Sequence, residues 1–163
     1  MGYVFEPMSA EHREPVMDIL NAFIAKSFAA YGEEPVDYDF FDELLDESRG
    51  YPSLVVRDSS TGIVGFAFMH ANHAAIALNS QAVITYFIMP DHTRKGLGTS
   101  ILERFVREAR KQGLESILAS VSSRNQQSVC FHLKNGFREC GRFCNIGMKF
   151  GQCYDAIWMQ LHI

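Results

Sequence analysis

The sequence carries no excess of basic charge. Lys and Arg number 15 against 19 Asp and Glu, which gives the 163 residues a formal net charge of −4. A protein that neutralises a nucleic-acid backbone needs a broad basic face. We therefore expect no nucleic-acid partner.

Long apolar runs are absent as well. A membrane-spanning helix needs about 18 or more consecutive apolar residues, and no segment offers them. The first residues, MGYVFEPMSAEHREP, lack the positive flank and apolar run of a secretory signal. We expect a cytoplasmic protein without a membrane partner.

Cysteine is scarce and confined to the last quarter of the chain. Cys130, Cys140, Cys144 and Cys153 are separated by ten, four and nine residues. This spacing matches neither a CxxC pair nor a zinc ribbon, so we predict no metal site. Without a secretory signal, free thiols in or near a core are the preferred interpretation.

The chain shows no internal repeat, low-complexity tract or linker rich in proline and glycine. Its 47% hydrophobic and 21% charged residues are typical of a globular protein. A chain of this length buries roughly 70% of the surface that it exposes when unfolded. We predict a single domain over residues 1–163.

Hydrophobic periodicity predicts a mixture of strands and helices. An N-cap at Ser9 precedes a helix through residues 16–24, and further helices are expected at 38–48, 98–112 and 125–133. Strands are expected at 3–6, 53–58, 63–70, 82–89, 116–121, 137–146 and 154–162. This order predicts an α/β (α+β) fold with a mostly antiparallel sheet that carries helices.

The segment PDHTRKGLGTSIL joins a buried strand to a helix through a basic, glycine-containing turn. Such a turn presents unpaired backbone N–H groups at the positive end of a helix dipole, and glycine allows an anion to approach closely. The Walker pattern GxxxxGK[ST] is absent, and GxGxxG fails because its third glycine would fall at Ile101. The segment predicts a phosphate site of another kind.

This turn resembles the pyrophosphate loop of the GCN5-related N-acetyltransferase (GNAT) superfamily, Q/R-x-x-G-x-G/A. Gly96 and Gly98 fill the glycine positions, and Thr93 stands where Gln or Arg is usual. Downstream, NQQSVCFHLKNGF is similar to the family pattern N-x-x-A/S-x-x-x-H/Y-x-x-x-G-F. The residues in register with it are Asn125, Ser128, His132, Gly136 and Phe137.

The C-terminal segment GRFCNIGMKFGQCYDAIWMQ resembles the phosphinothricin acetyltransferase branch, with Cys153 in place of the usual Trp. The resemblance implies the GNAT fold with about seven strands, acetyl-CoA as donor and a homodimer. For Lys149, Phe150 and Asp155, hairpin structure or a dimer contact is preferred over direct substrate binding. Acetyl-CoA is expected to contact Phe87, Ile88, Thr93, Arg94, Lys95, Gly96, Leu97, Gly98, Thr99, Asn125 and Ser128.

The implied activity is direct transfer of an acetyl group to the primary amine of a small molecule. Two alternatives stay open: a non-catalytic domain that binds or senses acyl-CoA, and a protein N-acetyltransferase. The branch often has Arg in the loop before the core strand, but HANHAAIALNSQA has no Arg or Lys, which weakens the case for an acidic amino-acid analogue. We expect an acceptor site near Phe28, Tyr31, Glu34 and Val83.

The general base is the main departure. An alkyl ammonium has a pKa near 10 and must lose a proton before it reacts. The branch commonly carries a glutamate at the position of Val83, and no Asp or Glu occurs between Gly62 and Met89. Substitutes are His70, His73, Glu34 and Tyr86 acting through water.

The general acid of the superfamily is often a tyrosine four residues before the GF pair, a position that holds His132 here. His132 could protonate the leaving thiolate, hydrogen-bond CoA, or pack on its helix. Asn125 has two interpretations as well, as a helix N-cap and as a cofactor contact. We predict His132 and Tyr86 as catalytic residues.

Overall fold

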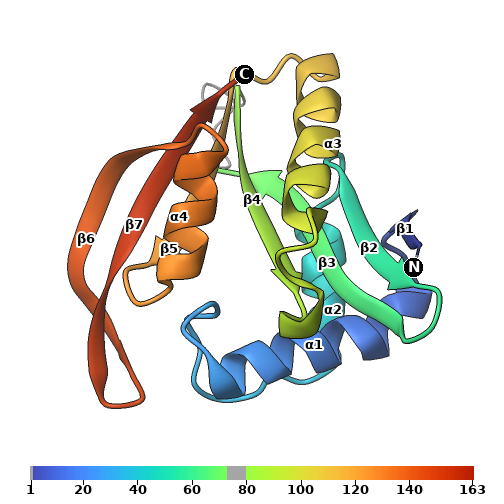
Figure 1. Ribbon diagram of the computed structural model, residues 1–163, viewed down its shortest axis with the longest axis horizontal. Coiled ribbons are helices and arrows are strands. Elements are labelled where there is room, and N and C mark those ends of the chain that lie inside the picture. Colours follow the sequence, from blue (N-terminus) through green and yellow to red (C-terminus); the bar gives the residue numbers. More distant parts are fainter. Residues whose placement is uncertain (1, 73–79) are drawn as a thin grey trace.

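The computed structural model describes residues 2–72 and 80–163, which build a seven-stranded sheet with helices on both faces (Figure 1). The strand order is β1-β2-β3-β4-β5-β7-β6. Strands β4 and β5 pair in parallel, and the other neighbouring strands pair antiparallel. The strands are β1 (Tyr3–Pro7), β2 (Ser53–Asp58), β3 (Gly62–Ala71), β4 (Gln81–Ile88), β5 (Ser116–Ser122), β6 (Arg138–Lys149) and β7 (Gln152–His162). The expected mixed fold and strand number are confirmed.

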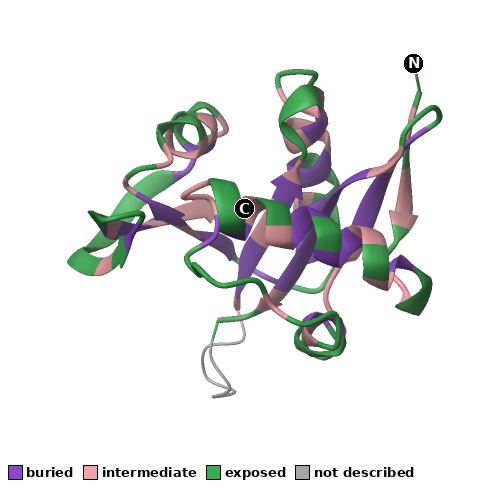
Figure 2. Cartoon of the chain, turned by 90° about the horizontal axis from the view of Figure 1, so that it is seen from below, coloured by how far each residue is buried: buried purple, intermediate pink, exposed green. Residues whose placement is uncertain are grey.

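Two hydrophobic cores hold the helices against opposite faces of the sheet. One core packs α1 (Arg13–Lys26) and α2 (Phe40–Glu47) against Val55, Phe66 and Phe87. The other packs α3 (Leu97–Lys111) against the opposite side chains of the same strands, with α4 (Gln126–Lys134) alongside through Val129. Figure 2 shows the buried residues concentrated in the strands between these two helical layers.

The sequence predicted these elements because their periodicity matches their burial. In α3, the apolar residues Ile101, Leu102, Phe105 and Ala109 fall on one face and are buried, as expected. Short 3-10 turns, η1 (Ala10–His12) and η3 (Pro90–His92), precede α1 and follow β4. The last two strands are longer than predicted because they form a hairpin that extends beyond the apolar core.

The interpretation of the cysteines as buried or near-core thiols is wrong. All four are exposed. Cys140 and Cys144 lie on β6, which is an edge strand whose side chains are almost all exposed. Position in the sheet therefore outweighs the usual preference of cysteine for burial.

The parallel strands β4 and β5 separate after a short paired segment. Their register runs from Gln81 and Ser116 only to Val83 and Leu118, whereas β4 continues to pair with β3 as far as Ile88. The two strands thus splay apart. Beyond Val83, one edge of β4 faces a gap in the sheet.

Candidate functional site

A cavity of about 740 Å³ passes through the gap between β4 and β5. Its wall includes Ser27 and Phe28, which follow α1 on one face of the sheet. It also includes Gly96 and Phe131, which belong to the α3 and α4 layer on the other face. The cavity therefore connects the two faces of the sheet.

Backbone groups of β4 are free at this gap. The Met89 N–H donates to the Val64 carbonyl at 2.8 Å, so alternate residues of β4 bond to β3. By this alternation the N–H and C=O of Ile88 face away from β3 and toward the gap, while those of Phe87 are used in the β3 ladder. Ile88 thus offers free backbone groups at the gap, and Phe87 does not.

The N-terminus of α3 is suited to an anion. Gly96 adopts a left-handed conformation with φ of 82°, and no side chain caps the helix. The first helical bond joins Ser100 N–H to the Gly96 carbonyl at 3.0 Å, which leaves the N–H groups of Leu97, Gly98 and Thr99 without a helical partner. No acidic residue occupies the first turn, so the helix dipole favours a phosphate group there.

The two helices approach closely beside this anion site. A Cβ on Gly98 would lie 3.0 Å from the Phe131 ring, so a side chain there would push α4 away. Thr99 Oγ1 donates to Asn135 Oδ1 at 3.4 Å, and Arg94 and Lys134 add positive charge to the cavity wall. These groups fit the diphosphate of a CoA molecule.

The partly buried Tyr86 and the buried His132 form a pair behind this site. The Tyr86 hydroxyl lies 2.5 Å from His132 Nε2, and His132 Nδ1 lies 2.7 Å from the Ser128 carbonyl oxygen. Because a carbonyl only accepts, Nδ1 carries the proton and Nε2 accepts from the phenol. Burial raises the pKa of Tyr86, and burial lowers the pKa of His132 against the opposing effect of the Ser128 carbonyl, so both groups are neutral at pH 7.

An aromatic wall lies on the α1 side of the gap. The Tyr31 ring stacks on Tyr154 at 5.4 Å, and Phe28 contacts both Tyr154 and Phe150 edge-on. The Tyr31 hydroxyl lies 2.7 Å from Ser120 Oγ on β5, and burial raises the pKa of this phenol. Of these aromatic residues, Phe28 lines the cavity.

The β6–β7 hairpin supports the same wall from behind. Lys149 is fully buried, and its Nζ donates to the Ala30 carbonyl at 2.7 Å. Burial lowers the pKa of Lys149. The Phe150 N–H donates to Glu33 Oε1 at 2.8 Å. The contacts of Lys149 and Phe150 hold the loop after α1 in place, which supports the structural interpretation of both residues.

The four substitutes for the missing base have different environments. Val83 is buried and pairs with His70 in the β3–β4 register, so His70 lies beside it on the α1 face. Glu34 is exposed on the loop after α1, and Tyr86 faces α4 instead. His73 lies outside the described residues.

Most of the predicted site residues line one cavity. They are Phe28, Tyr86, Phe87, Ile88, Thr93, Arg94, Gly96, Leu97, Gly98, Thr99, Asn125 and Ser128. Lys95, Tyr31, Glu34, Val83 and His132 do not reach its wall. Asn125 also caps α4, since its Oδ1 accepts from Ser128 N–H at 3.2 Å. The roles of these residues stay predictions.

Sequence reasoning missed several residues of the cavity wall, among them Arg124, Phe131 and Lys134. Arg124 directly precedes the N-cap of α4, and Lys134 is the last residue of that helix. Both are cations at the ends of the helix that carries Asn125, Ser128 and His132. Their positive charge and their positions at the two ends of this helix could have identified them as residues of an anion-binding site.

Within the described residues, no three His, Cys, Asp or Glu side chains gather in an arrangement that could hold a metal ion. None of the helices in residues 2–72 and 80–163 combines the length and apolar character that crossing a membrane requires.

The sequence is similar to known acetyltransferases along most of its length. It is 29% identical over 150 residues to an L-methionine sulfoximine/L-methionine sulfone acetyltransferase of Pseudomonas aeruginosa, covering 91% of this chain and 87% of that protein. It is 26% identical over 155 residues to a phosphinothricin N-acetyltransferase of Streptomyces viridochromogenes, covering 94% and 84%.

The fold is similar to that of a solved phosphinothricin acetyltransferase of the GNAT superfamily from Sinorhizobium meliloti in complex with acetyl-CoA. The TM-score is 0.92 at 21% identity, with 100% of this chain and 89% of that chain covered. The sequence model of the acetyltransferase (GNAT) family matches residues 16–137. With its splayed strands and its anion site at α3, this chain belongs to the acetyltransferase (GNAT) family.

Proposed function

We propose that this protein transfers the acetyl group of acetyl-CoA directly to the primary amine of a small molecule, an amino acid or an amino-acid analogue. The cavity through the gap between β4 and β5 carries the proposal, because it lets a donor and an acceptor meet from opposite faces of the sheet. The relatives named for methionine sulfone and phosphinothricin acetylation support this acceptor class.

The donor side uses the α3 and α4 layer. When bound, acetyl-CoA supplies a thioester whose carbonyl carbon forms a bond to the amine nitrogen while the carbon–sulfur bond breaks. The free N–H groups at the start of α3, together with Arg94 and Lys134, hold the diphosphate. Ile88 presents an unpaired backbone N–H at the gap, and a donor of this kind stabilises developing negative charge on oxygen by about 3 kcal/mol.

Two proton transfers complete the reaction, one at each face of the sheet. His70 lies opposite Val83, outside the cavity wall, and acts as the base through water. Its Nδ1 lies 3.0 Å from the Ala71 carbonyl, so Nε2 is the nitrogen that accepts the proton. On the other face, Tyr86 lines the cavity. Its hydroxyl turns from His132 Nε2 to protonate the leaving thiolate, and the phenolate then regains a proton from solvent. His132 acts through Tyr86 as a positioning residue, because it orients the hydroxyl without reaching the cavity.

Release of free CoA thiol from acetyl-CoA tests the proposal. The acceptor panel should contain amino acids, sulfone and sulfoximine analogues, polyamines and peptides with free N-termini. Turnover with small amines supports the proposal. Turnover with peptides alone indicates a protein N-acetyltransferase, and tight acetyl-CoA binding without turnover indicates a non-catalytic binding domain.

The exposed surface of β6 also supports a homodimer. Phe143, Ile146 and Met148 are 57%, 58% and 62% exposed on this edge strand. A free strand edge with apolar side chains is a surface that proteins usually cover. A second copy of this chain is the proposed occupant, and the cytoplasm, which contains acetyl-CoA, is the proposed location.

A further inference from the structure

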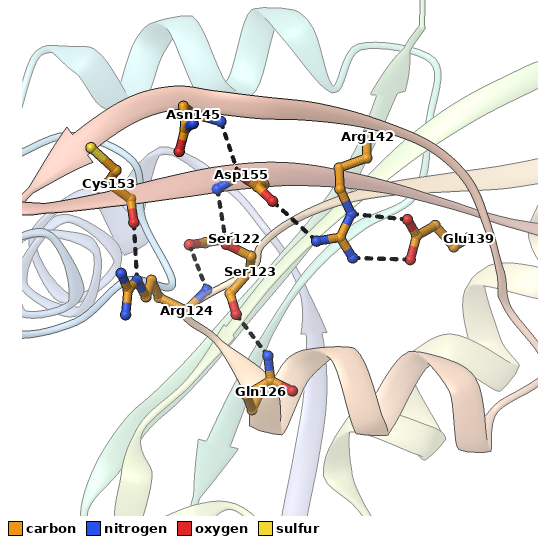
Figure 3. A network of polar contacts seen from close by, with 9 residues as sticks. All are labelled: Ser122, Ser123, Arg124, Gln126, Glu139, Arg142, Asn145, Cys153 and Asp155. Atoms are coloured by element: carbon orange, nitrogen blue, oxygen red, sulfur yellow. Dashed lines mark hydrogen bonds and ion pairs between the residues drawn. The ribbon is translucent and has the colours of Figure 1, made fainter.

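The turn between β5 and α4 is held rigidly against the start of β7. The Asp155 N–H donates to Ser123 Oγ at 2.8 Å, and the Ser123 N–H donates to the Asp155 carbonyl at 2.9 Å. Within the turn, the Arg124 N–H donates to Ser122 Oγ at 3.2 Å. Figure 3 shows this network joining the turn to β7.

The Arg124 side chain is part of the same network. Its Nε donates to the Cys153 carbonyl at 3.0 Å, which fixes the plane of the guanidinium group (Figure 3). In the described part of the chain, neither terminal nitrogen has a hydrogen-bond partner, and no carboxylate is close enough for an ion pair. The nearby Asp155 binds Arg142 and the Asn145 N–H instead. Arg124 is therefore an oriented cation that makes no close ion pair within the described residues, although its charge contributes to lowering the pKa of Asp155.

Arg124 lines the cavity at a distance from the diphosphate site. It lies ten residues before Lys134, and α4 rises by about 1.5 Å per residue, so the two positions are separated by roughly 15 Å. Lys134 and Asn135 lie beside the start of α3. A single diphosphate cannot reach from that end of α4 to Arg124.

The neighbours of Arg124 belong to the aromatic wall. Cys153, which accepts its hydrogen bond, is followed by Tyr154, and the Tyr154 ring lies 6.4 Å from the ring of Phe28. Phe28 and Arg124 both line the cavity. Through Cys153 and Tyr154, Arg124 is thus connected to the side of the cavity that the loop after α1 bounds.

We infer that Arg124 binds the anionic group of the acceptor, a carboxylate in the case of an amino acid, and so selects acceptors that carry an anion besides the amine. Its two terminal nitrogens form a planar fork that matches the two oxygens of a carboxylate. The segment HANHAAIALNSQA contains no Arg or Lys to do this. The inference rests on the proposed transferase function and names the feature of the acceptor that the same site recognises.

The test compares two acceptors that differ in charge, L-methionine sulfone and its carboxamide, in the wild type and in Arg124→Gln. Wild type should prefer the carboxylate. Arg124→Gln should raise KM for the carboxylate acceptor about 10- to 100-fold and leave KM for the carboxamide within about threefold. Arg110→Gln is the matched control, because it removes an exposed positive charge in the last turn of α3, and it should change KM for neither acceptor.

A second measurement does not depend on turnover. Calorimetric titration of methionine sulfone into the protein saturated with CoA should give binding in the wild type and a loss of about 10-fold or more in Arg124→Gln. Three results would overturn the role of Arg124. Arg124→Gln could change KM equally for both acceptors or raise KM for acetyl-CoA, or the wild type could bind the carboxylate and the carboxamide equally well. Wild type that binds the acceptor but acetylates no amine would contradict the proposed function and leave the anion site supported by binding.

Discussion

The Tyr86 hydroxyl donates to Nε2 of His132 across 2.5 Å, and this contact joins β4 to α4 on the donor side of the gap. The two rings are nearly parallel, with 5.6 Å between their centroids. Nδ1 of His132 is committed to the Ser128 carbonyl, so the imidazole can only accept from the phenol. The contact with His132 therefore fixes the position of the Tyr86 hydroxyl beside the cavity.

Replacement of Tyr86 by Phe should lower kcat about 100-fold and leave KM for acetyl-CoA nearly unchanged. The phenyl ring keeps the packing against Phe131, but the proton for the leaving thiolate is lost. Steady-state kinetics over a range of pH would check this. A Tyr86→Phe enzyme with wild-type kcat would assign proton donation to solvent.

The depressed pKa of His132 predicts an acid-sensitive fold. Its ordinary pKa is 6.5, and burial lowers the pKa in the folded protein. Between these two values the unfolded chain binds a proton that the folded chain does not. The contribution of His132 to stability is therefore complete above pH 6.5 and is lost as the pH falls below it, with a slope of up to about 1.4 kcal/mol per pH unit.

Urea denaturation between pH 5 and 8 would measure this effect. His132→Asn should lose less stability than wild type between pH 7.5 and 5.5, because the variant cannot take up the extra proton on unfolding. His162→Asn, at an exposed position of β7, should follow the wild-type profile. Parallel profiles for all three proteins would contradict a depressed pKa at His132.

The sequence was informative where a local pattern sets the structure. The periodicity of α3 and the glycines before it were sufficient to predict a helix that begins with an anion site. The contact between Tyr86 and His132 could not be predicted, because it joins residues that are 46 positions apart and depends on how α4 packs over β4. The orientation of the Arg124 side chain could not be predicted for a similar reason, since its partner Cys153 comes from a strand later in the chain.

Gly96 should be required for binding of acetyl-CoA more than for folding. Gly96 and Gly113 have similar left-handed φ values, 82° and 76°, and a Cβ would meet no atom within 4 Å at either position. Alanine at either site should therefore cost about 1 to 2 kcal/mol of stability through backbone strain. Only Gly96→Ala should also raise the Kd for acetyl-CoA, by about 10-fold, and calorimetry on both variants checks this difference. Equal Kd values would move the diphosphate away from the start of α3.

The exposed edge of β6 should hold a dimer together. Replacement of Ile146 and Met148 by Lys places two charges on this surface and should give a monomer in sedimentation experiments. Val4→Lys, on the edge strand at the other side of the sheet, is the matched control because Val4 is 53% exposed. A monomeric wild type would rule out the dimer, and a dimer that survives both Lys substitutions would place its interface elsewhere.

His70 should matter most when the acceptor is protonated. At pH 7 only about one thousandth of an amine with a pKa near 10 is neutral, so a base that removes the proton raises the rate. His70→Gln should lower kcat/KM for the acceptor by about 10- to 100-fold at pH 7, and the deficit should shrink as the pH rises toward 9. Tyr86→Phe should stay slow at every pH, because its missing proton is needed after the amine attacks.

Glu34→Gln, which changes an exposed carboxylate on the loop after α1, should retain activity. If Glu34→Gln shows the pH-dependent loss and His70→Gln does not, the base lies on that loop, and the position of His70 opposite Val83 has no catalytic role.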